Sequence, residues 1–269
     1  MKIHLLAIDL DGTLLNSAKR IGAATVKAIA AARREARVRV VLASARPPRS
    51  VAPFYRQLDL DTPMINYNGA LVYDPPSARV LMHRPLPLKT AKRIVELARH
   101  WYSDVLVSAE VLDRWYTDRV DGEYQTETAG LFKPDMVAPL GEWLNQALTK
   151  LLLLGDPSRL AGLAGRIRKE FLHQVSIVQT DEYLLQIMHA TVSKVQALRT
   201  VAAELGVTRE GVMAIGDNAN DVGMLQWAGV SAAMANATPE AIAAADFVTK
   251  HNDADGVAEA IRKVILNGG

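Results

Sequence analysis

Two aspartates stand two residues apart just after a largely apolar run near the N-terminus. The run, residues 3–8, leads into Asp-Leu-Asp-Gly-Thr at residues 9–13. Such a run is typical of a strand buried on both faces of a parallel sheet, and Gly12 ends it. Asp9 and Asp11 are therefore expected at the carboxyl end of the strand, where open α/β sheets bind their ligands. Two like charges this close favour a cation between them, or one protonated carboxyl.

Taken alone, the same stretch has two other interpretations. Asp-x-Asp-Gly is also a common turn after a strand. It resembles half of an EF-hand loop as well, but that loop spaces its acids differently and follows a helix. Motifs elsewhere in the sequence are needed to distinguish a turn from a catalytic site.

Composition excludes several classes of protein. The 269 residues are 49% hydrophobic, enough for one large or two smaller domains, and the net charge of +2 with no basic block argues against a nucleic-acid partner. The absence of cysteine removes disulfides and thiolate chemistry. The N-terminus lacks a signal-peptide pattern, and the longest other apolar run, residues 151–154, is too short to cross a bilayer. We expect a cytoplasmic protein without a membrane partner, as a monomer or small homo-oligomer.

The order of predicted elements indicates an α/β domain interrupted by an insert. A helix over residues 23–36 and a strand over residues 38–43 follow the first strand, which implies a right-handed parallel crossover that brings Ser44 to the edge of Asp9. Residues 85–188 mix helices and strands in the manner of a small α+β domain. We therefore predict a doubly wound parallel-sheet, Rossmann-like core over residues 1–84 and 189–269, with the α+β cap inserted between them.

Polar groups from four parts of the chain are expected at one edge of this core. They are Asp9 with Asp11, Ser44, Lys194, and Asp217 with Asn220 and Asp221. Four carboxylates in one place would repel one another, and a hard divalent cation resolves this. An all-oxygen site of this kind favours Mg²⁺. A cation, a lysine, a hydroxyl and backbone amides together suit a phosphate group.

These residues carry a resemblance to a known family. Asp-Leu-Asp-Gly-Thr at residues 9–13, the hydroxyl of Ser44, Lys194, and Gly-Asp-Asn-Ala-Asn-Asp at residues 216–221 are similar to the four motifs of the haloacid dehalogenase superfamily. The position of the insert resembles the Cof-type subfamily with its C2-type cap, as do residues 68–70, 234–237 and 245–249. The similarity extends over nearly the whole chain, more weakly in the insert.

The resemblance implies roles for the matching positions. Asp9 would attack phosphorus and form an aspartyl phosphate, and Asp11 would protonate the leaving alcohol and then activate water. Ser44 would hydrogen-bond the phosphoryl group, and Lys194 would neutralise it. The implied metal residues are Asp9, Asp11 through its main-chain carbonyl, Asp217, and Asp221, the last supporting Lys194 or the metal's waters. The implied phosphate- or substrate-binding residues are Leu10, Ser44, Ala45, Arg46, Asn68, Gly69, Lys194 and Asn220.

Three positions depart from the family pattern. Members usually have glycine where this chain has Ala45, Val195 and Ala235. Ala45 would displace Ser44 if that loop needed a positive φ, whereas no departure removes a chemical group.

The function that follows is a Mg²⁺-dependent phosphatase acting on a small phosphorylated metabolite, such as a sugar phosphate or pyridoxal phosphate. Two alternatives stay open: a phosphomutase on the same fold, and a catalytically weak phosphometabolite-binding regulator. Loss of Asp9 or Asp11 would favour the regulator, and both are present.

Overall fold

The computed structural model describes residues 2–124 and 127–267. The chain divides into two compact units: Met1–Met82 with Ser193–Gly269, and His83–Val192. We call them the core unit and the inserted unit. The insert predicted over residues 85–188 lies within the second.

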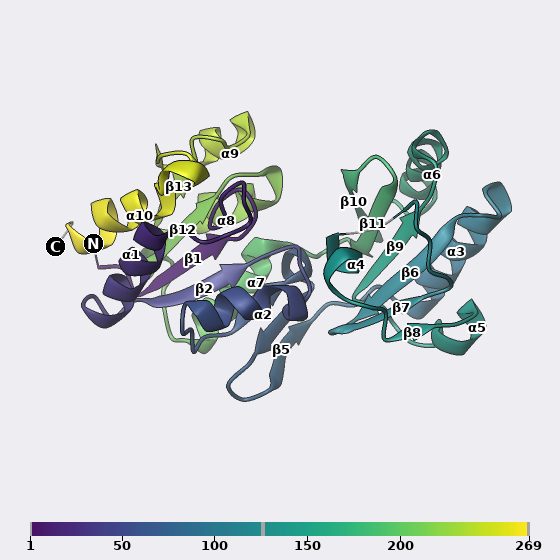
Figure 1. Ribbon diagram of the computed structural model, residues 1–269, viewed down its shortest axis with the longest axis horizontal. Helices are drawn as coiled ribbons and strands as arrows, with labels where there is room; N and C mark the ends of the chain where they lie inside the picture. Colours follow the sequence, from purple (N-terminus) through teal and green to yellow (C-terminus); the bar gives the residue numbers. More distant parts are fainter. Residues whose placement is uncertain (1, 125–126, 268–269) are drawn as a thin grey trace. The chain divides into compact units, whose positions relative to one another are not determined.

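An eight-stranded sheet organises the core unit, in the order β14-β13-β12-β1-β2-β3-β4-β5 (Figure 1). Its central strand, β1, pairs in parallel with β2 on one side and with β12 on the other. β3 pairs antiparallel with β4. The bounds are β1 Leu5–Asp9, β2 Arg39–Ala43, β3 Met64–Asn66, β4 Leu71–Asp74, β5 Arg79–His83, β12 Val212–Gly216, β13 Val230–Ala233 and β14 Phe247–Val248.

Helices cover both faces of this sheet because its central strands are apolar on both faces. Alternate residues of a strand point to opposite sides, so Leu6 and Ile8 pack in one hydrophobic cluster, and Leu5 and Ala7 pack in another. Residues of α1, α2 and α10 belong to the first cluster, and residues of α7, α8 and α9 to the second. The doubly wound fold predicted from the sequence is confirmed. The bounds are α1 Ala23–Arg34, α2 Pro48–Gln57, α7 Lys194–Glu204, α8 Val222–Trp227, α9 Pro239–Ala244 and α10 Gly256–Ile261.

Short segments of other helix types complete the core unit. They contribute turns at the ends of strands rather than layers. The 3₁₀ segments are η1 Tyr67–Gly69, η2 Arg209–Gly211, η3 Ala219–Asp221 and η4 Asn252–Ala254, and η5, Arg262–Leu266, is a π-helix.

The inserted unit is a six-stranded sheet in the order β10-β11-β9-β6-β7-β8, antiparallel except for the β7–β8 pair. Helices α3 and α6 pack on it, with Ile94 and Leu163 against Val107 and Leu153. This is the predicted α+β insert. Its strands are β6 Leu106–Val111, β7 Arg114–Thr117, β8 Met136–Val137, β9 Lys150–Leu154, β10 Val175–Asp181 and β11 Leu184–His189, and its helices are α3 Leu88–Trp101, α4 Glu127–Leu131, α5 Leu140–Trp143 and α6 Pro157–Glu170.

Element boundaries differ from the predicted ones by a few residues. The helix predicted over residues 23–36 ends at Arg34, because the N–H of Glu35 makes the last helical bond to Ala31 and the chain then turns into β2. The short elements α4 and β8 lie in the stretch where the sequence shows little periodicity. Over the described residues, no helix combines the length and apolarity needed to span a membrane.

Candidate active site

The carboxyl ends of three neighbouring strands bring the chemically active residues to one edge of the core sheet. Asp9 is the last residue of β1 and pairs with Ala43, so Ser44 follows directly on β2. On the other side, Ile8 pairs with Ile215, and Asp217 begins just beyond β12. The parallel register therefore delivers the predicted residues to one place.

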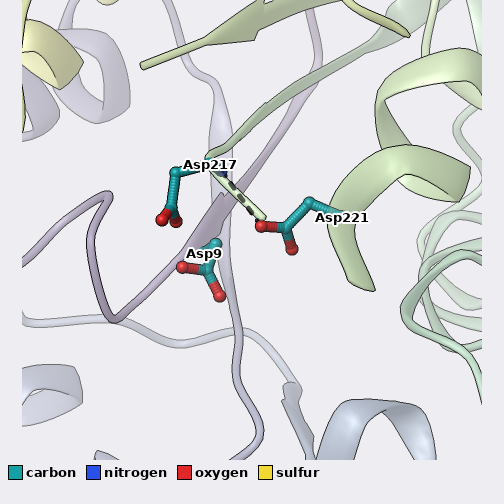
Figure 2. Close-up of side chains that lie close together, drawn as sticks. All are labelled: Asp9, Asp217 and Asp221. Atoms are coloured by element: carbon teal, nitrogen blue, oxygen red, sulfur yellow. Dashed lines mark hydrogen bonds between the residues drawn. The ribbon is translucent and has the colours of Figure 1, made fainter. Parts of the chain in front are cut away.

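Three carboxylates form a cluster at this edge. Asp9, Asp217 and Asp221 each offer a carboxylate oxygen, and these oxygens all lie within 4.8 Å of one another (Figure 2). Figure 2 shows the Asp9 carboxylate next to that of Asp217, with Asp221 arriving from the start of a helix. The hydroxyl of Thr13 donates to Asp217 Oδ1 at 2.7 Å and fixes its orientation.

A buried lysine lies against this cluster. Lys194 Nζ donates to Asp9 Oδ1 and, at 2.6 Å, to Asp221 Oδ1, and its side chain is 1% exposed. Lys194 is the first residue of α7, whose N-cap Ser193 accepts a hydrogen bond from Gln196 N–H. The bond from Lys194 to Oδ1 holds the Asp9 carboxylate in one orientation at the end of β1.

Gly69 explains how α7 can begin so close to the site. Its φ is +96°, and a Cβ there would collide with the carbonyl oxygen of Ser193. The glycine therefore allows the chain after β3 to pass the start of α7, which places Lys194.

Both carboxylate oxygens of Asp221 accept hydrogen bonds from other parts of the protein. Besides Lys194 on Oδ1, its Oδ2 accepts the main-chain N–H groups of Asp217 at 3.1 Å and Asn218 at 3.0 Å. A Cβ on Gly216 would lie 2.6 Å from the Cβ of Asp221, so glycine is needed for this close approach. These bonds shape the loop that presents Asp217 and hold Lys194 in place.

Burial and like charge act together on the acids. Burial, followed by the charges of Asp221 and Asp217, raises the pKa of Asp9 well above its usual value, against the opposing effect of Lys194. Burial also raises the pKa of Asp217. Burial alone would lower the pKa of Lys194, but the carboxylates of Asp221 and Asp9 more than offset this and raise it. The site is thus short of positive charge.

Asp11 lies outside this cluster, in an ion pair with two cations. Arg46 donates to it through Nε at 2.6 Å and Nη2 at 2.5 Å, and Lys19 Nζ donates at 2.8 Å. Burial tends to raise the pKa of Asp11, yet the hydrogen bonds and charges of Arg46 and Lys19 outweigh burial and lower it. Asp11 is therefore held as a carboxylate.

The remaining candidates line the loops after β2 and β3. Ser44 Oγ accepts from Arg46 N–H at 3.1 Å, and its own main-chain oxygen accepts from Asn68 N–H at 2.9 Å. Asn220 Nδ2 donates to Asn68 Oδ1 at 2.9 Å, which joins the fourth predicted motif to the loop after β3. Ala45 is not among the residues with positive φ, so its methyl group does not strain the loop.

Leu10 can contribute only through its main chain, because its side chain is fully buried in the core. Sequence reasoning gave no role to Thr13 or Lys19. Thr13 lies inside the Asp-Leu-Asp-Gly-Thr motif, which was a usable signal. Lys19 reaches Asp11 through a turn in which its own φ is +55°, and no spacing rule predicts that contact.

The donor set fits a hard divalent cation. Three carboxylates meet one lysine in a buried site, so the charges present leave a negative excess that a divalent ion would neutralise. Asp221 accepts three hydrogen bonds, from Lys194 and two amides, whereas Asp9 accepts one from Lys194 and Asp217 one from Thr13, so Asp9 and Asp217 are the better candidates to bind the ion.

Known phosphatases are similar to this chain over nearly its full length. The chain is 30% identical over 271 residues to 5-amino-6-(5-phospho-D-ribitylamino)uracil phosphatase YitU of Bacillus subtilis, an alignment that covers 97% of each chain. It is also 30% identical over 272 residues to pyridoxal phosphate phosphatase YbhA of Escherichia coli, with 97% of this chain and 98% of the relative covered.

Solved structures show the same fold over nearly the full length. A haloacid dehalogenase-like hydrolase from Bacteroides thetaiotaomicron superimposes with a TM-score of 0.88 and 28% identity, over 98% of this chain and all of the other. A Thermotoga maritima protein gives a TM-score of 0.86 and 29% identity over 97% of each chain. The family model described as haloacid dehalogenase-like hydrolase matches residues 6–261. The chain therefore belongs to the haloacid dehalogenase-like hydrolases, which confirms the family, the fold and the hydrolase class predicted from its motifs.

Proposed function

We propose that this protein is a Mg²⁺-dependent phosphatase that hydrolyses a small phosphorylated metabolite through a phosphoryl group carried on Asp9. One observation supports this most directly. Asp9 is the last residue of a central strand, its Oδ1 accepts a hydrogen bond from the buried Lys194, and its carboxylate lies beside that of Asp217. A carboxylate held this way is oriented for attack and next to groups that can neutralise phosphate charge.

The first half-reaction transfers the phosphoryl group to the protein. Asp9 Oδ2 forms a bond to phosphorus, and the bond between phosphorus and the leaving oxygen breaks. The electron pair stays on that oxygen, which takes a proton from Asp11 after Arg46 and Lys19 have released the Asp11 carboxylate and it has bound a proton. Lys194 neutralises the phosphoryl oxygens, and Ser44 and Asn220 donate hydrogen bonds to them. In the second half-reaction Asp11 takes a proton from water, which attacks phosphorus and releases Asp9 and phosphate.

The metal would be held by the carboxylates of Asp9 and Asp217 and by the main-chain carbonyl of Asp11. When bound, Mg²⁺ supplies charge neutralisation for the transferring phosphoryl group. Asp221 supports Lys194 and the loop of Asp217 rather than the ion itself, because its oxygens already accept three hydrogen bonds.

The substrate class follows from the relatives. The named relatives act on a ribitylaminouracil phosphate and on pyridoxal phosphate, both small phosphate monoesters. We propose a substrate of this size, with the inserted unit selecting the alcohol that leaves.

The test compares Asp9→Asn with a surface control, Asp61→Asn. Asp61 is an exposed aspartate of the same unit, 3.4 Å from Arg33, and takes no part in the site. Hydrolysis of p-nitrophenyl phosphate is measured with Mg²⁺ and with EDTA. We expect Asp9→Asn to lose activity by roughly 10³-fold or more, Asp61→Asn to match the wild type, and EDTA to abolish turnover.

A second readout identifies the nucleophile. Acid quenching during turnover, followed by mass spectrometry, should find a phosphoryl group on the peptide that contains Asp9. Full activity in Asp9→Asn, or a phosphoryl group on another residue, would exclude the assignment.

A further inference from the structure

Two asparagines near the C-terminus fasten the loop that follows β1. Asn236 Nδ2 donates to the main-chain oxygen of Gly12 at 2.8 Å, and Asn236 Oδ1 accepts from the N–H of Asn252 at 3.0 Å. Asn252 Nδ2 in turn donates to the main-chain oxygen of Leu15 at 2.9 Å. Hydrogen bonds thus connect the loop at residues 12–15 to Asn236 and Asn252, which lie more than 200 residues later in the sequence.

The segment that contains Asn236 also holds the other half of the acidic cluster. Met234 N–H donates to the oxygen of Gly216 at 3.1 Å, and Thr238 N–H donates to the oxygen of Asp217 at 2.8 Å. Asn236 lies between these two bonds. Asn236 therefore joins the segment that is bonded to Gly216 and Asp217 to the loop that carries Asp11.

The contact between that loop and Asp217 leaves little room for adjustment. Gly12 has a φ of +82°, and a Cβ on it would collide with the carboxylate of Asp217. Thr13 donates to the same carboxylate at 2.7 Å. Asn236 bonds the carbonyl of the peptide between Gly12 and Thr13, so a rotation of the backbone at Gly12 would change where the Asp11 carbonyl lies relative to the Thr13 hydroxyl and Asp217.

We infer that Asn236 is a positioning residue for the metal site. It fixes the distance and orientation between the main-chain carbonyl of Asp11 and the carboxylate of Asp217. This inference rests on the proposed function, in which both groups bind the same ion. An asparagine suits the task because one amide donates at its nitrogen and accepts at its oxygen, so a single side chain joins two loops.

The experiment measures Mg²⁺ binding to the full chain by calorimetry, without substrate. Asn236→Ala removes both bonds of the amide. Asn252→Ala is the matched control, because its main-chain N–H can still donate to Asn236 while only the bond to Leu15 is lost. Asn145→Ala is a second control, whose amide also donates to a main-chain oxygen, that of Glu142, but in the inserted unit.

We expect the Kd for Mg²⁺ to rise about five-fold in Asn236→Ala, the effect of losing one net hydrogen bond, and to stay within about two-fold of the wild type in both controls. With p-nitrophenyl phosphate, the Mg²⁺ concentration for half-maximal rate should rise in parallel while kcat at saturating Mg²⁺ recovers. Asn236→Ser, too short to make both bonds, replaces the alanine variant if that variant does not fold.

Three results would overturn the inference. The Kd of the Asn236 variant could stay within two-fold of the wild type while its unfolding temperature drops, which would indicate a purely structural role. Asn252→Ala could weaken binding as much as Asn236→Ala, which would indicate general loosening of the loop. Absence of Mg²⁺ binding to the wild type would remove the metal from the proposed function and the inference with it.

Discussion

Replacement of Lys194 by methionine tests how the buried charges of the site balance. Methionine keeps an unbranched side chain of similar length but carries no charge. The Lys194 side chain is 1% exposed and contacts both Asp9 and Asp221, so the variant leaves two carboxylates buried without their cation. Asp217, in the same cluster, adds to the repulsion.

The expected cost follows from what each carboxylate retains. Removing one partner of a buried ion pair costs about 3–5 kcal/mol of unfolding free energy. Asp221 keeps its bonds from two main-chain amides, and Asp9, whose pKa is already raised, can bind a proton. Both effects limit the loss to the lower end, about 3 kcal/mol at neutral pH without metal.

The pH dependence has a definite sign. Without Lys194, the pKa of Asp9 in the folded protein rises further above its unfolded value, because the lysine lowers it in the wild type. The folded variant then binds more protons than the unfolded chain, so its stability falls as pH rises through the range between the two pKa values. The deficit relative to the wild type should therefore be smaller at acidic pH than at neutral pH.

Urea unfolding with EDTA and with Mg²⁺ measures these effects. The variant site is more negative by one charge, so Mg²⁺ should restore more stability to Lys194→Met than it adds to the wild type. Lys150→Met is the control: Lys150 is also buried and lies 3.1 Å from Glu110, but in the inserted unit. It should destabilise the protein without changing the effect of Mg²⁺. The reasoning is refuted if Lys194→Met unfolds at the wild-type urea concentration, or if Mg²⁺ stabilises both proteins equally.

Two further substitutions probe single positions. Gly12→Ala forces a methyl group against Asp217 and should weaken Mg²⁺ binding by calorimetry at least ten-fold, roughly the loss of an oriented ligand; Gly206→Ala, with φ +64° and no atom within 4 Å of the added Cβ, carries the same backbone strain and should leave Mg²⁺ binding unchanged. Burial lowers the pKa of His83, so the unfolded chain binds more protons below the usual histidine pKa and stability declines as pH falls. Urea midpoints should show this decline from pH 7.5 to 5.5 in the wild type and a weaker one in His83→Gln; identical profiles would contradict it.

The sequence predicted where the strands end, and hence which acids meet. Asp9 is the last residue of β1 and Asp217 follows β12, and these two strands pair in parallel, so the sheet edge brings the two aspartates together. Lys194 was predicted as the start of a helix and is one. These placements depend on periodicity and connection rules, which a single sequence carries.

The bonds that tune the site could not be predicted in the same way. Lys19 reaches Asp11 through a left-handed turn, and Asn236 reaches Gly12 from a loop whose path depends on tertiary contacts. The effect of replacing the family's usual glycines could not be predicted from the sequence either. The sequence left the φ of Ala45 open; in the structure Ala45 is not among the residues with positive φ, whereas Gly12, Gly69 and Asn68 are.

Asp221 shows why a list of acids overstates the number of metal ligands. Its side chain is as acidic as that of Asp217 and lies in the same cluster, so composition and spacing cannot separate them. The hydrogen bonds differ: Asp221 accepts two main-chain amides and Lys194, whereas Asp217 accepts the hydroxyl of Thr13 on Oδ1. One carboxylate therefore builds the loop and anchors the lysine, and the second is left for a cation. In the proposed function, Asp9 and Asp217 would hold the divalent ion, and Lys194 would add a second positive charge at the Asp9 carboxylate.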